Sequence, residues 1–72
     1  MVEVFKTNIS SKRKAKIIRD RLEKTFPEYG INFDLEDCDK ILRVEAVSMD
    51  CESLIKEVKK LDSGISITIL EG

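Results

Sequence analysis

Histidine is absent from the chain, and with it the side chain that most often activates a serine or cysteine nucleophile near neutral pH. Carboxylates are plentiful, but they fall on predicted turns and solvent-facing positions. Nothing in their spacing indicates a buried pair that could share acid–base work. The sequence therefore favours a protein that is not an enzyme, and no motif in it indicates a cofactor.

Cysteine is scarce: Cys38 and Cys51 are too few for a disulfide framework, and neither lies in a spacing typical of a zinc site. This content fits a reducing compartment. The first residues, MVEVFK, carry charge by the third position, and the chain has no apolar run of about 18 residues. We therefore expect a cytoplasmic protein with no secretory signal and no membrane association.

Proline and glycine are also scarce, one and three residues respectively, which leaves little room for a disordered linker. The 72 residues are close to the lower limit for a core that folds without metal or disulfides, so we expect one domain over residues 1–72. Thirteen basic and fourteen acidic residues give a net charge of −1. No global field then attracts nucleic acid or an anionic membrane.

Alternating apolar and polar residues predict four short strands, over residues 2–6, 31–36, 42–46 and 65–70. Apolar residues at helical spacing predict a first helix that begins after Asn8, Ser10 or Ser11 and stops at Pro27. The same spacing predicts a second helix over residues 51–61.

The second helix is expected to have Ser48 or Asp50 as its N-cap and Gly64 just after its end. The resulting order, β-α-β-β-α-β in about 70 residues, is the split βαβ pattern of the α+β ferredoxin-like sandwich. We expect an antiparallel four-stranded sheet with both helices on one face. This topology places the first loop and the turn at residues 37–40 at one end and Cys51 at the other, so we expect two free thiols.

RNA-binding proteins of this fold stack bases on aromatic residues of the open sheet face. The chain has only four aromatic residues, of which Phe33 shares the predicted core face and Phe26 lies on the core stripe of the first helix; the others are Phe5 and Tyr29. The sequence therefore does not favour a nucleic-acid partner.

Charge is distributed unevenly despite the small net charge. Residues 12–24 carry seven basic and two acidic side chains, whereas residues 28–52 carry eight acidic and two basic ones. The basic run includes Lys12, Arg13 and Lys14 at the start of a helix, where the helix dipole already concentrates positive charge. Something nearby should compensate these cations or use them.

Three interpretations of this basic start are open. The topology brings the acidic turn with Asp37 and Asp39 close to it, and this turn could compensate the charge without any ligand. Alternatively, the helix start could bind a phosphate or carboxylate or dock an acidic protein partner. The candidate residues for such a site are Asn8, Ser10, Ser11, Lys12 and Arg13.

The element order, the length and the stretch GINFDLEDCDKILRVEA together resemble the heavy-metal-associated domain of copper chaperones and metal-pumping ATPases. In that family, a Met-Thr-Cys-x-x-Cys loop before the first helix presents two thiolates to a soft cation. The corresponding stretch here is Lys-Thr-Asn-Ile-Ser-Ser, residues 6–11, with Asn8 and Ser11 near the two cysteine positions. An amide and a hydroxyl cannot replace two thiolates for Cu(I).

The resemblance therefore implies the scaffold without its metal loop. One further metal candidate is Cys38 with Asp37 and Asp39, a weak set in which flanking negative charge disfavours the thiolate. We expect a non-catalytic binding domain that takes a small ion or a partner at the end formed by residues 6–13 and 36–40. The alternative is a protein-interaction module that uses the basic helix and the acidic hairpin or the exposed sheet edges.

Overall fold

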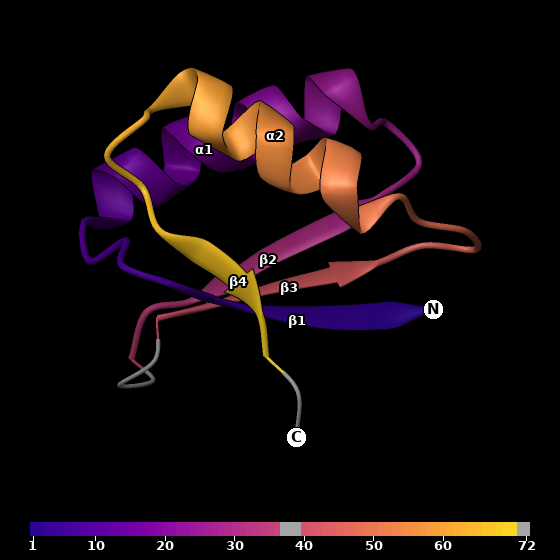
Figure 1. Ribbon diagram of the computed structural model, residues 1–72, viewed down its shortest axis with the longest axis horizontal. Coiled ribbons are helices and arrows are strands. Elements are labelled where there is room, and N and C mark those ends of the chain that lie inside the picture. The colour runs from indigo at the N-terminus through magenta and orange to yellow at the C-terminus, as the bar shows by residue number, and fades with distance from the viewer. Residues whose placement is uncertain (37–39, 71–72) are drawn as a thin grey trace.

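The fold is an antiparallel sheet covered on one face by two helices, and the computed structural model describes residues 1–36 and 40–70 of it (Figure 1). The elements are β1 (Val2–Thr7), α1 (Lys12–Thr25), β2 (Gly30–Asp34), β3 (Ile41–Glu45), α2 (Cys51–Leu61) and β4 (Ile67–Ile69). The strand order is β2-β3-β1-β4. This confirms the predicted ferredoxin-like α+β arrangement.

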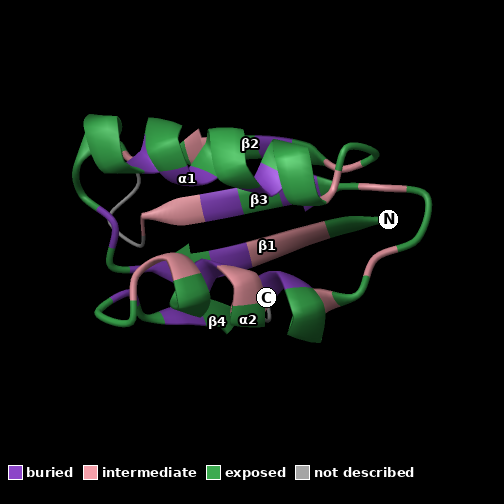
Figure 2. Ribbon diagram, turned by 90° about the horizontal axis from the view of Figure 1, so that it is seen from above, coloured by how far each residue is buried: buried purple, intermediate pink, exposed green. Residues whose placement is uncertain are grey.

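The core lies between the sheet and the helices, and β1 runs through its middle. Phe5 on β1 pairs with Leu42 on β3 and with Ile69 on β4, and both Phe5 and Leu42 are fully buried. Helix α1 covers the β2 side of the sheet and α2 covers the β4 side (Figure 2). The buried apolar residues are Phe5, Ile9, Ala15, Ile18, Leu22, Ile31, Leu42, Val44, Leu54, Val58, Ile65 and Ile67.

The observed bounds differ from the predicted ones by up to two residues. Strand β4 begins at Ile67, because the backbone N–H of Ile65 turns to the carbonyl of Asp62 and closes the turn after α2. Strand β2 begins at Gly30, one residue before the predicted strand, and ends at Asp34, two residues before its predicted end. Of the two predicted caps, Asp50 is the N-cap of α2, since its side chain accepts from the Ser53 N–H at 3.2 Å.

Two aromatic rings connect the end of α1 to the start of α2. Phe26 and Tyr29 stack with their ring centroids 4.8 Å apart, and the Tyr29 hydroxyl accepts a hydrogen bond from the Asp50 N–H at 2.9 Å. The turn that follows α1 is thereby attached to the N-terminus of α2. Neither helix in the described ranges is long and apolar enough to cross a membrane.

The C-terminal end of β1 is fixed by a buried threonine. The Thr7 hydroxyl donates to the Lys40 carbonyl at 2.6 Å and accepts from the Ile9 N–H at 3.2 Å, while the Thr7 N–H donates to the same carbonyl at 3.2 Å. Ile9 is only 2% exposed although it lies in a loop. The contacts of Thr7 with Lys40 bring the end of β1 next to the start of β3, as the predicted topology requires, whereas residues 37–39 of the predicted turn lie outside the described residues. Cys51 lies at the opposite end of the domain (Figure 1).

Replacing Thr7 by valine should lower the free energy of unfolding by about 1–3 kcal/mol, because the buried N–H of Ile9 loses its acceptor while the shape of the side chain is kept. Urea unfolding measures the loss. Thr68→Val is the matched control, since Thr68 is exposed on β4. Equal effects of the two substitutions would contradict a structural role for the buried hydroxyl.

Candidate functional site

The polar atoms of Asn8, one of the predicted ligand residues, form hydrogen bonds within the fold. Its side-chain nitrogen donates to the Gly64 carbonyl at 3.2 Å, and its side-chain oxygen accepts from the Ser66 N–H at 2.9 Å. The Asn8 N–H also donates to the Ser66 carbonyl at 3.3 Å. Asn8 thus extends the pairing of β1 with the segment before β4, and its amide is not directed to a ligand.

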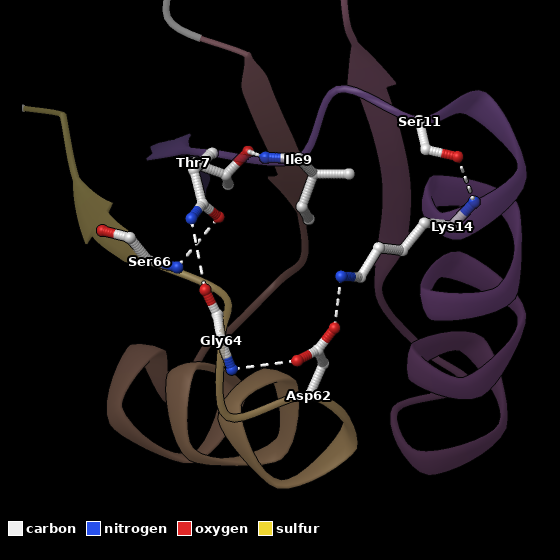
Figure 3. A network of polar contacts seen from close by, with 8 residues as sticks. Thr7, Ile9, Ser11, Lys14, Asp62, Gly64 and Ser66 are labelled. Carbon is white, nitrogen blue, oxygen red and sulfur yellow. Dashed lines mark hydrogen bonds and ion pairs between the residues drawn. The ribbon is translucent and has the colours of Figure 1, made fainter.

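Ser11, the other residue near a family cysteine position, is the N-cap of α1. Its hydroxyl accepts a hydrogen bond from the Lys14 N–H at 3.2 Å, as an N-cap side chain does (Figure 3). The remaining candidates at this end, Ser10, Lys12 and Arg13, are exposed. All five predicted residues are thus exposed, but the side chains of two of them, Asn8 and Ser11, are bonded to the backbone.

The positive charge at the start of α1 is compensated in part by Asp62, at the end of α2. Lys14 forms an ion pair with Asp62, the C-cap of α2, and the same carboxylate accepts from the Gly64 N–H at 2.9 Å. Its hydrogen bond with Lys14, followed by the one with Gly64, lowers the pKa of Asp62 below its ordinary value. Asp37 and Asp39, which one of the three sequence-based interpretations offered for this role, lie outside the described residues.

Cys51, the first residue of α2, is a free, half-buried thiol. Burial raises the pKa of Cys51, and the nearby carboxylates of Glu3 and Asp50 raise it further. The thiol therefore stays protonated and is a poor nucleophile and metal ligand. The weak metal candidate Cys38 lies outside the described residues, and the described residues contain no cluster of three or more potential metal-ligating side chains.

A groove of about 450 Å³ lies between α1 and the second half of β2. The wall from α1 consists mainly of long basic side chains, and the wall from β2 and the residues after it combines apolar, amide and acidic groups. Phe33 and Leu35 in this wall are half-buried against the core. The lining residues are Lys12, Ala15, Lys16, Arg19, Asn32, Phe33, Asp34, Leu35 and Glu36.

Strand β3 lies between β1 and β2, and the backbone hydrogen bonds next to its two ends show which of its residues bond to β1. Met1 and Ala46 exchange two backbone hydrogen bonds, of 2.6 and 2.9 Å. Lys40, six residues before Ala46 in the sequence, likewise bonds to β1, because its carbonyl accepts from the Thr7 N–H. In an antiparallel ladder, residues that bond to one neighbour alternate with those that bond to the other. The even-numbered residues of β3 therefore bond to β1, and the odd-numbered ones turn toward β2.

The same alternation applies to β2, whose Gly30, Asn32 and Asp34 lie opposite the odd-numbered residues of β3. The backbone N–H and C=O groups of Ile31 and Phe33 then point away from β3, toward the outer edge of the sheet. Strand β2 is an edge strand, and no further strand pairs with it among the described residues. The groove is thus bordered by a strand edge that can accept another strand.

The basic wall of the groove carries charge that the described part of the chain leaves uncompensated. Arg19 pairs with Glu23 one turn along the helix at 3.3 Å. Within residues 1–36 and 40–70, neither Lys12 nor Lys16 has an ion-pair partner. Both side chains are exposed and border the groove.

The basic helix and the sheet edges were separate candidates on the sequence alone, and the structure brings them together in this groove. The groove residues Ala15, Lys16 and Arg19 face the strand only because α1 packs over the β2 side of the sheet. The signal present in the sequence was the helical spacing of Lys12, Lys16 and Arg19, combined with the edge position that the fold gives to the second strand.

Comparison with protein-family models, with curated proteins and with solved structures gives no match to this chain.

The lowered pKa of Asp62 predicts a specific acid sensitivity. Because the folded state depresses this pKa, the Lys14–Asp62 contact stabilises the fold at neutral pH, and its contribution is lost as the pH falls through the folded pKa. Asp62→Asn should therefore flatten the loss of stability on acidification, as measured by urea unfolding across the acidic range.

Asp20→Asn is the control, since it removes the same charge from an exposed position on α1. Some slope should remain in Asp62→Asn, because the side chain and N–H of Ser53 lower the pKa of Asp50 as well. An unchanged pH profile in Asp62→Asn would show that the ion pair does not contribute in solution.

The bonded side chains of Asn8 and Ser11, at the positions where the resemblance would place the two cysteines, predict that Cu(I) finds no tight site there. Titration of the reduced protein with Cu(I) against a competing chelator should leave the metal with the chelator, because Asn8 and Ser11 supply no thiolate and hold the backbone. A stoichiometric complex that disappears in Cys38→Ser would contradict this result and identify Cys38 as the anchor of a different site.

Proposed function

We propose that this chain is a non-catalytic protein-interaction module and that its binding site is the groove between α1 and β2. The observation that carries the proposal is the combination of a strand edge, a half-exposed apolar floor at Phe33 and Leu35, and the basic wall of α1 in one depression. Grooves between a helix and an edge strand bind extended segments of other proteins by main-chain hydrogen bonds and side-chain pockets.

The chemistry of the remaining surface supports binding rather than catalysis. The chain has no histidine, and the Cys51 thiol is held in its protonated form by burial and nearby carboxylates. Nucleic acid is disfavoured as a partner, since Phe5 is buried, Phe33 shares its face of the sheet with buried Ile31, and Phe26 stacks on Tyr29 beyond the sheet.

We further propose that the scaffold is of the heavy-metal-associated type, with the thiolate loop replaced by residues that stabilise the fold. The order of the elements supports this relation, as does the position of Asn8 and Ser11 at the start of α1. In such a protein, the site of function has moved from the loop to the adjacent groove, which begins at Lys12 beside the same end of the domain. A small-anion site gains no support, since Asn8 and Ser11 are bonded within the fold.

The proposal is tested by selecting peptides from a random displayed library against the immobilised chain and mapping the amide chemical shifts that they perturb. The perturbed amides should gather in residues 12–19 and 31–36, which line the groove. Leu35→Ser should weaken the selected peptides about five- to tenfold, because half of a leucine side chain no longer contributes to the interface.

Leu70→Ser is the matched control, since Leu70 is a 38% exposed leucine that follows the opposite edge strand, β4. It should leave peptide binding unchanged. Selected peptides whose shifts gather on α2, or whose affinity Leu70→Ser reduces more than Leu35→Ser does, would contradict the assignment of the groove as the binding site.

A further inference from the structure

The groove beside β2 offers a backbone edge, an apolar floor and a basic wall to the same occupant. We infer, on the basis of the interaction function proposed above, that this occupant is an extended acidic segment of another protein, which adds to the sheet as a fifth strand beside β2. Each of the three features constrains a different part of that segment.

The backbone edge determines the conformation of the segment. The N–H and C=O groups of Ile31 and Phe33 point outward and lie two residues apart, which is the spacing at which a neighbouring strand makes its hydrogen bonds. Leu35 does not extend this edge in the same way, because its carbonyl accepts from the Lys40 side-chain nitrogen at 3.2 Å. The pairing is therefore short and centred on Ile31 and Phe33.

The two faces of the sheet determine which residues of the segment carry specificity. Ile31 is buried and Phe33 half-buried on the helix side, so residues of the segment level with them lie under α1. The intervening residues fall on the face of Asn32 and Asp34, which is exposed to solvent. Alternate residues of the segment therefore contact the groove. The others face solvent, and they only have to avoid strong repulsion by the Asp34 carboxylate.

The charge of the groove determines the sign of the helix-facing residues. Lys12, Lys16 and Arg19 lie on one stripe of α1, and the two lysines have no ion-pair partner in the described part of the chain. Carboxylates on the segment would form ion pairs with these cations, while a central apolar side chain would cover Phe33 and Leu35. The expected pattern is acidic, apolar, acidic at alternate positions.

A second copy of the chain fits this edge less well. Two copies that join through β2 about a twofold axis place their α1 helices side by side on the same face of the joined sheet. The basic stripes of Lys12, Lys16 and Arg19 would then lie on the same face of the joined sheet and repel each other. The charge distribution favours a partner of opposite sign.

The experiment uses the full chain and a synthetic peptide, Thr-Glu-Thr-Leu-Ser-Glu-Thr, with blocked termini. Its Glu and Leu residues alternate as the groove requires. Binding should perturb the amide shifts of the groove and slow hydrogen exchange at Ile31 and Phe33, whose N–H groups face the edge. The control peptide carries Lys in place of both Glu residues, and its affinity should be at least tenfold lower.

Two protein variants separate the basic wall from general charge attraction. Lys12→Gln with Lys16→Gln should weaken the acidic peptide about tenfold without breaking an ion pair of the described chain. Lys59→Gln with Lys60→Gln removes the same charge from the last turn of α2 and should leave the affinity within about twofold.

Equal binding of the acidic and lysine peptides, equal effects of the two double variants, or absence of protection at Ile31 and Phe33 would overturn the inference. The same protection in the free protein at high concentration, with dimers in solution, would identify a second copy as the occupant and overturn it too. Library peptides of other chemistry that perturb the groove would leave the proposed interaction function standing. Failure of every selected peptide to perturb the groove would remove both.

Discussion

Strand β1 lies between β3 and β4, and at its C-terminal end the bonds to both neighbours come from two adjacent residues, Thr7 and Asn8. The arrangement of the domain depends on this junction. Thr7 bonds to the Lys40 carbonyl at the start of β3, and Asn8 bonds to Gly64 and Ser66 before β4. In so small a core, few apolar contacts are available to set the relative positions of the strands. Five hydrogen bonds at two adjacent residues add to the strand ladders and join the end of β1 to the segments that precede β3 and β4.

Several polar side chains around this junction are used within the fold. The hydroxyl of Thr7 and the amide of Asn8 are bonded within the fold, and Ser11 caps the helix. The Lys14–Asp62 pair then connects the start of α1 to the end of α2 across the same region. The groove proposed as the binding site begins at Lys12, directly after this bonded loop.

The order and type of all six elements could be predicted from the sequence, because period-two and helical spacing of residues such as Ile31, Leu42 and Leu54 reflect which face of each element is buried. Ile9 could not be recognised as core, since it lies in a loop outside any periodic pattern. Asp62 could not be matched with Lys14, because that pair joins the ends of two helices 48 positions apart, a proximity that only the packed structure defines. The groove could not be predicted either, because its walls depend on which helix packs over which strand.

The stacked pair of Phe26 and Tyr29 gives the domain a built-in optical reporter. The chain has one tyrosine and no tryptophan, so its intrinsic ultraviolet fluorescence comes essentially from Tyr29. That ring rests on Phe26, and its hydroxyl bonds to the backbone at the start of α2, so its emission follows the docking of the α1–β2 turn onto the second helix. Tyr29 precedes β2, whereas the groove borders the second half of that strand. The emission of Tyr29 should therefore report whether the domain is folded, and it should change little when a ligand occupies the groove.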